Sequence, residues 1–302
     1  HDAFSVAIIS MMLISAVLSL LGIALIKERH IPETTKEDKV KVTDIFGMIK
    51  TNGALRIRLA DMLFTGFIWN FLFATATYYA KWAYCTDLTT GAVDTAKMGT
   101  FTMVSSLLMF FPLIIGTLVA SPIMKAIGSP IRFHRILILL EFVPGGILFV
   151  LQMVGLLQSL PAVYLLCMGV CACAIGMDYI PGEVINIEAM DYEIYKNGKD
   201  RSALCNAANK FLGKAQSAVA SGLVGVILVA VGYEVDSATD TFLGELSSIP
   251  VMLDWFIVIM GLIPFFLGLV GWLVLKRYPI TDEIRADMHE KLSGTSHAAG
   301  NT

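Results

Sequence analysis

Hydrophobic residues in this sequence gather in seven long runs, and shorter segments between the runs carry most of the charges. A helix needs about 20 consecutive apolar residues to cross the hydrocarbon core of a bilayer, and every run reaches that length. The pattern therefore predicts an all-α membrane protein with seven transmembrane helices. The predicted spans are residues 3–26, 59–80, 99–124, 136–157, 162–186, 204–232 and 251–275.

Composition agrees with this pattern and excludes several classes of protein. The chain is 56% apolar and 16% charged, against about 45–50% and about 25% in soluble domains. The motifs HExxH, GxSxG and the P-loop are absent, none of the five histidines lies in a predicted span, and the five cysteines form no CxxC pair. We expect no enzyme, no metal site, no cofactor and no nucleic-acid partner.

Positive charges indicate how the helices are oriented. If the amino end lies outside the cell, the inner segments hold 18 lysines and arginines and the outer segments hold only Lys81 and Lys97. Such an asymmetry predicts a cytoplasmic carboxyl end in a multi-pass protein of the plasma membrane, with the lipid bilayer as a partner. Aromatic residues agree, because Tyr78, Tyr79, Trp82 and Tyr84 cluster at one predicted boundary.

The connections divide the chain into four parts. We expect residues 1–26 to be the last helix of a truncated amino-terminal bundle, 27–58 a cytoplasmic linker, 59–275 a six-helix bundle and 276–302 a cytoplasmic tail. The chain begins at His1 and enters an apolar run without a basic leader, so we expect a fragment of a longer carrier.

Two short helices are predicted in the polar segments. The first has Thr43 as its N-cap and ends near Asn52 and Gly53, and the second has Thr281 as its N-cap. The predicted apolar side of the first helix consists of Ile45, Phe46 and Ile49, and that of the second of Ile284, Met288 and Leu292. The second helix suits the inner membrane surface or a solvated tail.

Several acidic residues fall within or beside the predicted spans. Asp61 and Asp254 lie close to predicted helix ends, where an interfacial position explains them as well as a function does. Glu141 precedes Pro144, whereas Asp178 and Glu183 bracket Pro181 and Gly182, so we expect helix breaks beside these acids. The roles of Glu141, Asp178 and Glu183 remain open at this point.

Lysines in the span 204–232 are the most informative polar residues. Asn206, Lys210, Lys214, Ser217 and Ser221 recur at helical spacing and form one polar stripe. Lys214 lies 13 residues beyond Arg201, or roughly 20 Å along a helix, which a lysine side chain cannot bridge back to the interface. We expect Lys214 to face a watery cavity or a carboxylate, with an ion pair that only joins helices as the alternative.

The stretch "EAMDYEIYKNGKDRS" resembles the signature of the glycoside, pentoside and hexuronide cation symporters, the melibiose-carrier group of the major facilitator superfamily. In that group an acid, two residues and Asp-Tyr precede a cluster of basic residues around a glycine. The matching positions here are Glu188, Asp191, Tyr192, Lys196, Gly198, Lys199 and Arg201. Lys214 also follows Asp191 by 23 residues, as the corresponding lysine does in the melibiose carrier.

The resemblance implies helices 6–12 of a twelve-helix transporter that works by alternating access. It implies a sugar substrate held by Lys214, Lys210, Asn209 and Glu183, and a cytoplasmic latch of Asp191, Tyr192, Lys196, Gly198 and Arg201. It also implies coupling to Na⁺ or H⁺ at a site in the missing amino-terminal half, which would be this chain's partner. Lys210 and Glu183 depart from the melibiose carrier; an extra lysine suits an acidic sugar, unless Glu183 neutralises it.

A seven-helix receptor or photoreceptor without transport activity is the alternative. Retinal proteins carry their Schiff-base lysine on the last helix, and the span 251–275 contains no lysine. The long basic linker after the first helix also fits a receptor poorly. A bundle that acts as a scaffold or binds lipid is a further alternative.

Overall fold

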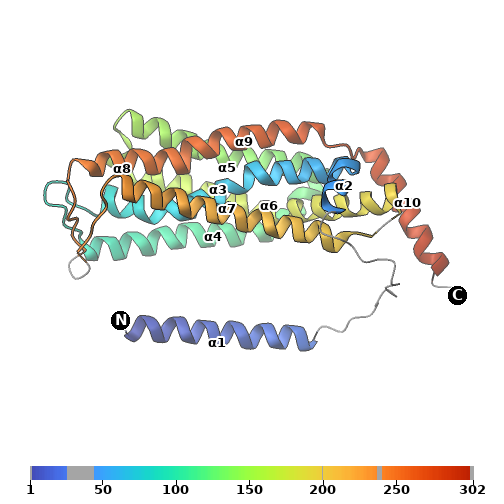
Figure 1. Cartoon of the computed structure of the whole chain (residues 1–302), viewed down its shortest axis with the longest axis horizontal. Coiled ribbons are helices and arrows are strands. Elements are labelled where there is room, and N and C mark those ends of the chain that lie inside the picture. Colours follow the sequence, from blue (N-terminus) through green and yellow to red (C-terminus); the bar gives the residue numbers. More distant parts are fainter. Residues whose placement is uncertain (1, 26–43, 199, 237–239, 300–302) are drawn as a thin grey trace. The chain divides into compact units, whose positions relative to one another are not determined.

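The computed structural model describes residues 2–25, 44–198, 200–236 and 240–299, which form two units, His1–Val40 and Lys41–Thr302 (Figure 1). Of the predicted features, Thr43, Lys199 and most of the linker lie outside the described residues. The first unit holds α1 (Asp2–Leu25), an apolar helix whose large side chains, such as Leu25 and Met11, are exposed. It corresponds to the first predicted span.

The second unit is a helical bundle (Figure 1). Its long helices are α3 (Gly53–Tyr84), α4 (Thr95–Ile127), α5 (Pro130–Met153), α6 (Pro161–Asn197) and α7 (Ser202–Ala230), followed by a rod of α8 (Ser248–Ile257), the π-helical turn η2 (Val258–Leu262) and α9 (Ile263–Val274). Short 3₁₀ turns lie at η1 (Leu157–Ser159) and η3 (Leu275–Arg277). In the described part of the chain, six helices are long and apolar enough to span a membrane, and α1 adds the shorter apolar stretch Ile9–Leu25.

Side chains at the helix ends explain where the helices begin and stop. Asn52 and Asp94 accept hydrogen bonds from the backbone N–H groups of Leu55 and Lys97, and so cap α3 and α4. Gly128 ends α4 with φ 74° and Gly198 ends α6 with φ 64°, a conformation that glycine adopts without a steric penalty. These caps place the helix starts several residues before the predicted apolar runs.

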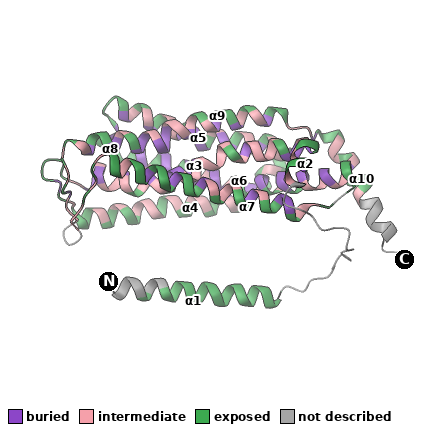
Figure 2. Ribbon diagram, viewed as in Figure 1, coloured by how far each residue is buried: buried purple, intermediate pink, exposed green. Residues whose placement is uncertain are grey.

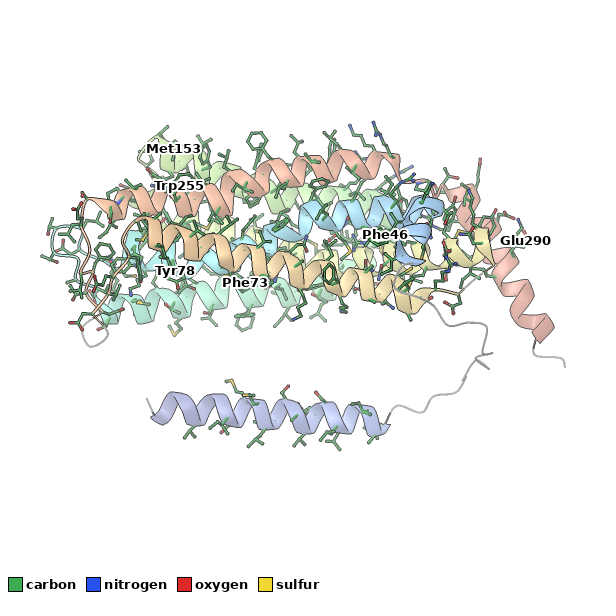
Figure 3. The ribbon with its side chains drawn as sticks, viewed as in Figure 1. Phe46, Phe73, Tyr78, Met153, Trp255 and Glu290 are labelled. Carbon is green, nitrogen blue, oxygen red and sulfur yellow. The ribbon has the colours of Figure 1, made fainter. Side chains whose placement is uncertain are left out.

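Helix α6 lies at the centre of the packing, between α4 and α5, while α3 packs against α7 and α9. Glycines allow α4 and α6 to approach closely, because a Cβ at Gly176 would collide with the carbonyl of Leu113. Thr117 Oγ1 donates to the Gly176 carbonyl at 2.9 Å across the same contact. Buried positions concentrate between the helices, whereas Phe73, Met153 and Trp255 point outward (Figures 2 and 3).

The helix breaks predicted beside the acids are wrong. Helix α5 continues through Pro144, and α6 continues through Pro181 and Gly182 to Asn197. Neighbouring helices support a proline-containing helix and resatisfy its backbone, so a proline in a span need not interrupt it. The signature residues from Asp191 to Asn197 consequently belong to the last turns of α6 and not to a loop.

Two short helices cover one end of the bundle, called here the α2/α10 end. Helix α2 (Asp44–Thr51) buries Met48 completely, whereas Phe46 is 77% exposed (Figure 3), so Phe46 was wrongly assigned to its apolar side. In α10 (Asp282–Ala299), Met288 is buried, and Thr281 Oγ1 accepts from the N–H of Ile284 as predicted for the cap. Both helices pack on one apolar cluster with Ala189 and Tyr192 of α6.

Aromatic residues gather at the opposite end of the bundle. The clustering predicted for Tyr79, Trp82 and Tyr84 is confirmed, but these side chains are buried and do not line the outer surface. Tyr79 stacks on Tyr164 with ring centroids 5.4 Å apart, and Trp82 meets Phe242 edge to face. These rings form a packed core, which holds the helix ends together.

Candidate functional site

A cavity of about 350 Å³ lies between α3, α6 and α7, with α5 forming part of its wall. Its lining combines aromatic rings, amides and charged groups, which is typical of ligand sites in membrane bundles. The lining residues are Arg58, Met62, Thr65, Gly66, Trp69, Asn70, His134, Glu141, Ile175, Asp178, Tyr179, Gly182, Glu183, Gly213 and Gln216.

Four charged side chains form a network at this cavity. Arg58 Nη1 donates to Asp61 Oδ2 at 2.6 Å, and His134 Nε2 lies 3.0 Å from the same oxygen. The other ring nitrogen of His134, Nδ1, contacts Asp178 Oδ1. We call Arg58, Asp61, His134 and Asp178 the histidine network; it joins α3, α5 and α6.

The geometry of the histidine network fixes its charge. Both nitrogens of His134 face carboxylate oxygens, and Arg58 Nη1 also lies 3.4 Å from Nε2. With Asp61 and Asp178 ionised, their oxygens only accept hydrogen bonds, so the ring donates from both nitrogens and carries a positive charge. One arginine and one imidazolium then balance two carboxylates. The network is electroneutral as a unit, which lowers the cost of holding its members inside the bundle.

Polar atoms in the network are left without partners. Asp61 is fully buried, and its Oδ1 makes no hydrogen bond in the described part of the chain, nor does Arg58 Nε. Nearly all buried polar atoms in native proteins are satisfied. Arg58 lines the cavity and Asp61 does not, so the orphaned Arg58 Nε indicates room for a ligand or water beside the cavity. Gly182 leaves space here, because a Cβ on it would lie 3.2 Å from Arg58 Nη2.

The same cavity offers groups that suit a polyhydroxylated ligand. Trp69 and Tyr179 contribute aromatic surface. Asn70, the residue after Trp69, donates from its Nδ2 to the Gly66 carbonyl at 2.8 Å and contributes an amide to the lining. Gln216 crosses over Gly66 and donates to the Met62 carbonyl at 2.6 Å, which leaves its Oε1 to accept from a ligand. Flat apolar faces combined with a few amide groups can hold a sugar ring and its hydroxyls.

The four predicted substrate residues differ in their burial, in their contacts and in whether they line the cavity. Glu183 is exposed and lines the cavity. Asn209 is buried and donates to Asn186 Oδ1 at 2.5 Å. Lys210 and Lys214 are exposed on α7 and are not among the lining residues, and neither makes an ion pair within the described residues. The possible pair between Lys210 and Glu183 is therefore not formed.

The five predicted latch residues all lie at the α2/α10 end, but the contacts there involve other partners. Lys196 Nζ donates to Tyr192 Oη at 3.3 Å, and Arg201 Nη1 lies 3.4 Å from Glu193 Oε1. Gly198 ends α6, and Asp191 is partly buried. Glu188 forms a two-pronged pair with Arg285 of α10, at 2.6 and 3.3 Å.

Asp61 and His134 were missed as functional residues because their spans were predicted to begin at 59 and 136. The caps on α3 and α5 move the helix starts to Gly53 and Pro130, so both residues lie inside helices. The sequence did contain one signal for this site. Arg58 and Asp61 are three residues apart, so on a helix their side chains lie on the same face and can form an ion pair.

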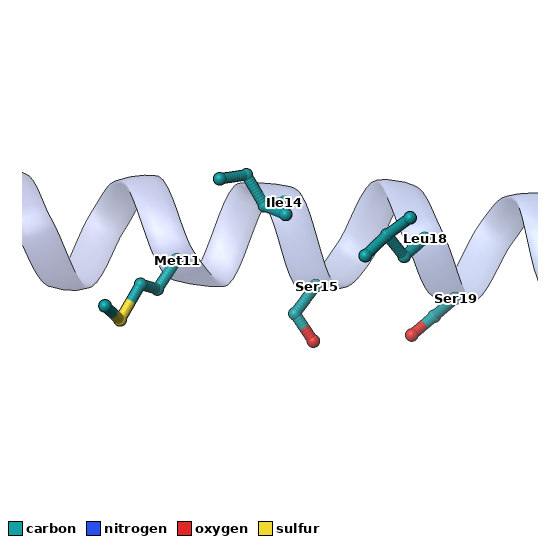
Figure 4. Close-up of a pocket in the computed structure, with 5 residues that line it drawn as sticks. All are labelled: Met11, Ile14, Ser15, Leu18 and Ser19. Carbon is teal, nitrogen blue, oxygen red and sulfur yellow. The ribbon is translucent and has the colours of Figure 1, made fainter.

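A second hollow, of about 440 Å³, lies on α1 alone (Figure 4). Met11, Ile14, Ser15, Leu18 and Ser19 line it, and all five are exposed. One helix supplies one wall only, so these residues do not enclose a ligand.

Comparison with known proteins gives one result. The profile of the family described as MFS/sugar transport protein matches residues 2–282. No curated protein matches, and no solved structure matches.

Proposed function

The chain belongs to the MFS sugar transport protein family, whose members are multi-pass membrane transporters and not enzymes, and from that premise we propose that it serves cation-coupled symport of a glycoside, pentoside or hexuronide. The mechanism is alternating access, in which two helix bundles rock around a central site. This chain supplies the carboxyl-terminal bundle, residues 59–275, together with the last helix of the amino-terminal bundle, the linker 27–58 and the tail 276–302.

The cavity between α3, α6 and α7 is the observation that carries this proposal. Its volume of about 350 Å³ suits one or two sugar rings, and Trp69, Asn70, Tyr179 and Gln216 provide stacking surface and hydrogen-bonding groups. Glu183 at the cavity adds an acceptor for sugar hydroxyls.

Apolar surfaces on the bundle support a second bundle as partner. Helices α4 and α7 carry large exposed side chains, including Phe110, Leu118, Phe211 and Val226. Lipid chains and the amino-terminal bundle would both cover such a surface. The positive-inside asymmetry supports an orientation with the α2/α10 end in the cytoplasm of the cell and the aromatic end outside.

Lys214 is assigned to the substrate site in this proposal, with Lys210 and Asn209 one turn earlier. It follows Gly213, which lines the cavity, and its exposed side chain has no carboxylate partner in the described residues. A lysine at this depth is stable only beside water, substrate or a group on the second bundle. A positively charged group here favours a sugar that carries a carboxylate.

The latch is assigned to the α2/α10 end. Asp191, Tyr192, Lys196, Gly198 and Arg201 lie where α6 turns into α7, next to the Glu188–Arg285 pair. Charged contacts between bundles at this end would close the inner mouth of the cavity and separate when it opens.

Uptake of labelled sugars tests the proposal. Neutral glycosides and hexuronides are offered, with and without Na⁺, to proteoliposomes that contain the complete carrier. We expect Lys214→Met to abolish uptake while membrane insertion and abundance stay near wild type. Lys97→Met, which removes an exposed lysine outside the cavity, is the matched control and should transport normally.

Normal uptake by the Lys214→Met carrier would refute the assignment of Lys214 to the site. Loss of the protein itself would instead favour a purely structural role in helix pairing. The 302-residue chain alone should bind sugar without catalysing uptake, and uptake by this chain alone would contradict its assignment as a fragment.

A further inference from the structure

Glu141 is a buried acid that the substrate site does not use. Only 7% of its surface is exposed, and its carboxyl group makes no hydrogen bond in the described residues. On one side it adjoins a gap of about 10 Å³, which holds no more than a single water. On the other side it lines the large cavity, which connects it to bulk water.

The side chains around Glu141 determine whether its neutral or its ionised form is more stable. The histidine network beside it is already electroneutral, with Arg58 and His134 balancing Asp61 and Asp178. An ionised Glu141 would add one negative charge that no side chain in contact compensates. Isolated buried charges cost several kcal/mol, so Glu141 is held neutral unless water in the cavity solvates it.

The helices packed around Glu141 supply both neutral and titratable groups. The wall from α7 contributes Gly213 and Gln216, and η2 contributes Met260, none of which titrates. The charged or titratable groups that line the gap or the cavity with Glu141 are Arg58 on α3, His134 on α5, and Cys167, Cys171, Asp178, Tyr179 and Glu183 on α6; Asp61 on α3 adjoins them through His134.

We propose that Glu141 is a proton-binding site on the wall of the sugar cavity, and that its protonation is coupled to the binding of sugar. This inference rests on the proposed sugar site and adds a proton site in the same bundle.

The coupling follows from the shared cavity. Sugar that enters the cavity displaces the water on which an ionised Glu141 depends, so sugar binding favours the protonated acid. By linkage, protonation of Glu141 favours sugar binding to the same extent. Protonated Glu141 can also donate a hydrogen bond to a hydroxyl of the sugar, whereas the carboxylate can only accept one.

Infrared difference spectroscopy on the 302-residue chain in lipid nanodiscs tests the proton site without relying on transport. A pH series from about pH 5 to about pH 10 covers the range in which buried glutamates titrate. We expect a carboxylic-acid band that disappears as the pH rises, is absent in Glu141→Gln, and persists in Glu183→Gln. The control removes an exposed acid of the same cavity. Glu141→Asp, which keeps a carboxyl group, should show the band at a shifted position.

The same samples test the coupling through binding of a nitrophenyl glycoside and a nitrophenyl glucuronide. We expect wild-type affinity to rise on the order of tenfold from alkaline to acidic pH, and Glu141→Gln to bind tightly at every pH. Glu245→Gln, which removes an exposed acid outside the cavity, should keep the wild-type affinity and its dependence on pH.

The absence of a titrating band assigned to Glu141 would overturn the proton site, whatever the sugar result. Equal dependence of sugar affinity on pH in wild type and Glu141→Gln would overturn the coupling. A titrating Glu141 in a chain that binds neither sugar would support the proton site and refute the proposed substrate.

Discussion

Two buried polar networks lie along α3, one around Asp61 and one around Tyr79, roughly 27 Å apart at 1.5 Å per residue. The histidine network is ionic. The second, which we call the tyrosine network, consists mainly of neutral groups: Tyr79 Oη donates to Gln152 Oε1 at 2.7 Å, and Gln152 Nε2 donates to Asp254 Oδ1 at 2.8 Å. Both networks join helices that are distant in sequence.

The two networks differ in how fully their hydrogen bonds are satisfied. In the tyrosine network, Tyr79 and both ends of the Gln152 amide have partners. In the histidine network, Asp61 Oδ1 and Arg58 Nε have none among the described residues, and Arg58, His134 and Asp178 line the cavity. A satisfied network specifies packing, whereas an unsatisfied one beside a cavity is suited to bind a ligand.

The largest effect should come from His134→Leu. This change removes the cation between Asp61 and Asp178 and leaves buried negative charge unpaired, which costs about 3–5 kcal/mol of stability. Thermal unfolding in detergent, followed by circular dichroism, measures it. His289→Leu on the exposed side of α10 is the control and should unfold near the wild-type temperature. Equal stability of the two variants would show that the histidine network is not ionic.

A smaller effect should come from Gln152→Leu in the tyrosine network. The change leaves the Tyr79 hydroxyl and Asp254 without their partner, at a cost of about 1–3 kcal/mol. Adding Tyr79→Phe should restore part of the loss, because both ends of that hydrogen bond are then apolar. Sugar binding should stay unchanged in either variant. A loss of binding at normal stability would mean that this end of the bundle also acts in function.

The smallest effect concerns the docking of α10, outside both networks. The hydroxyl of Tyr195, donating at 2.6 Å, and then Lys291 hold the pKa of Asp287 below its usual value. A lowered pKa in the folded state stabilises docking above the unfolded pKa, and this stabilisation is lost as the pH falls through the folded pKa. The protection factors of α10 amides, which are exchange rates relative to the intrinsic rate at the same pH, should therefore fall at acidic pH.

Tyr195→Phe removes the main cause of that shift. The protection factors of α10 amides should then depend less on pH. The control is Tyr179→Phe, which changes an exposed tyrosine of the same helix α6 and should leave the dependence intact. If Tyr195→Phe retains the wild-type dependence, Asp287 does not control the docking of α10.

Hydropathy predicted the spans well but not their ends. The six long helices of the bundle coincide with predicted runs, because the need to keep backbone groups satisfied in lipid leaves a helix as the only form for such a run. The ends were misjudged because polar caps extend helices beyond the apolar residues: α3 begins at Gly53 after Asn52, and α6 runs to Asn197. Because the predicted span began at residue 59 and α3 begins at Gly53, Asp61 was wrongly interpreted as an interfacial residue.

The sequence by itself determined the class of protein and the six long spans of the bundle, since both depend on length and composition along one helix. Only the tertiary structure decided which charges meet. Arg58, Asp61, His134, Asp178 and Glu141 come from three helices, and their distances depend on how α3, α5 and α6 pack. Glycine contacts such as that of Gly176 with α4 set that packing. Pairing between helices leaves no periodic trace in a single sequence, so the cavity, and with it the proposed proton site, emerges from the fold alone.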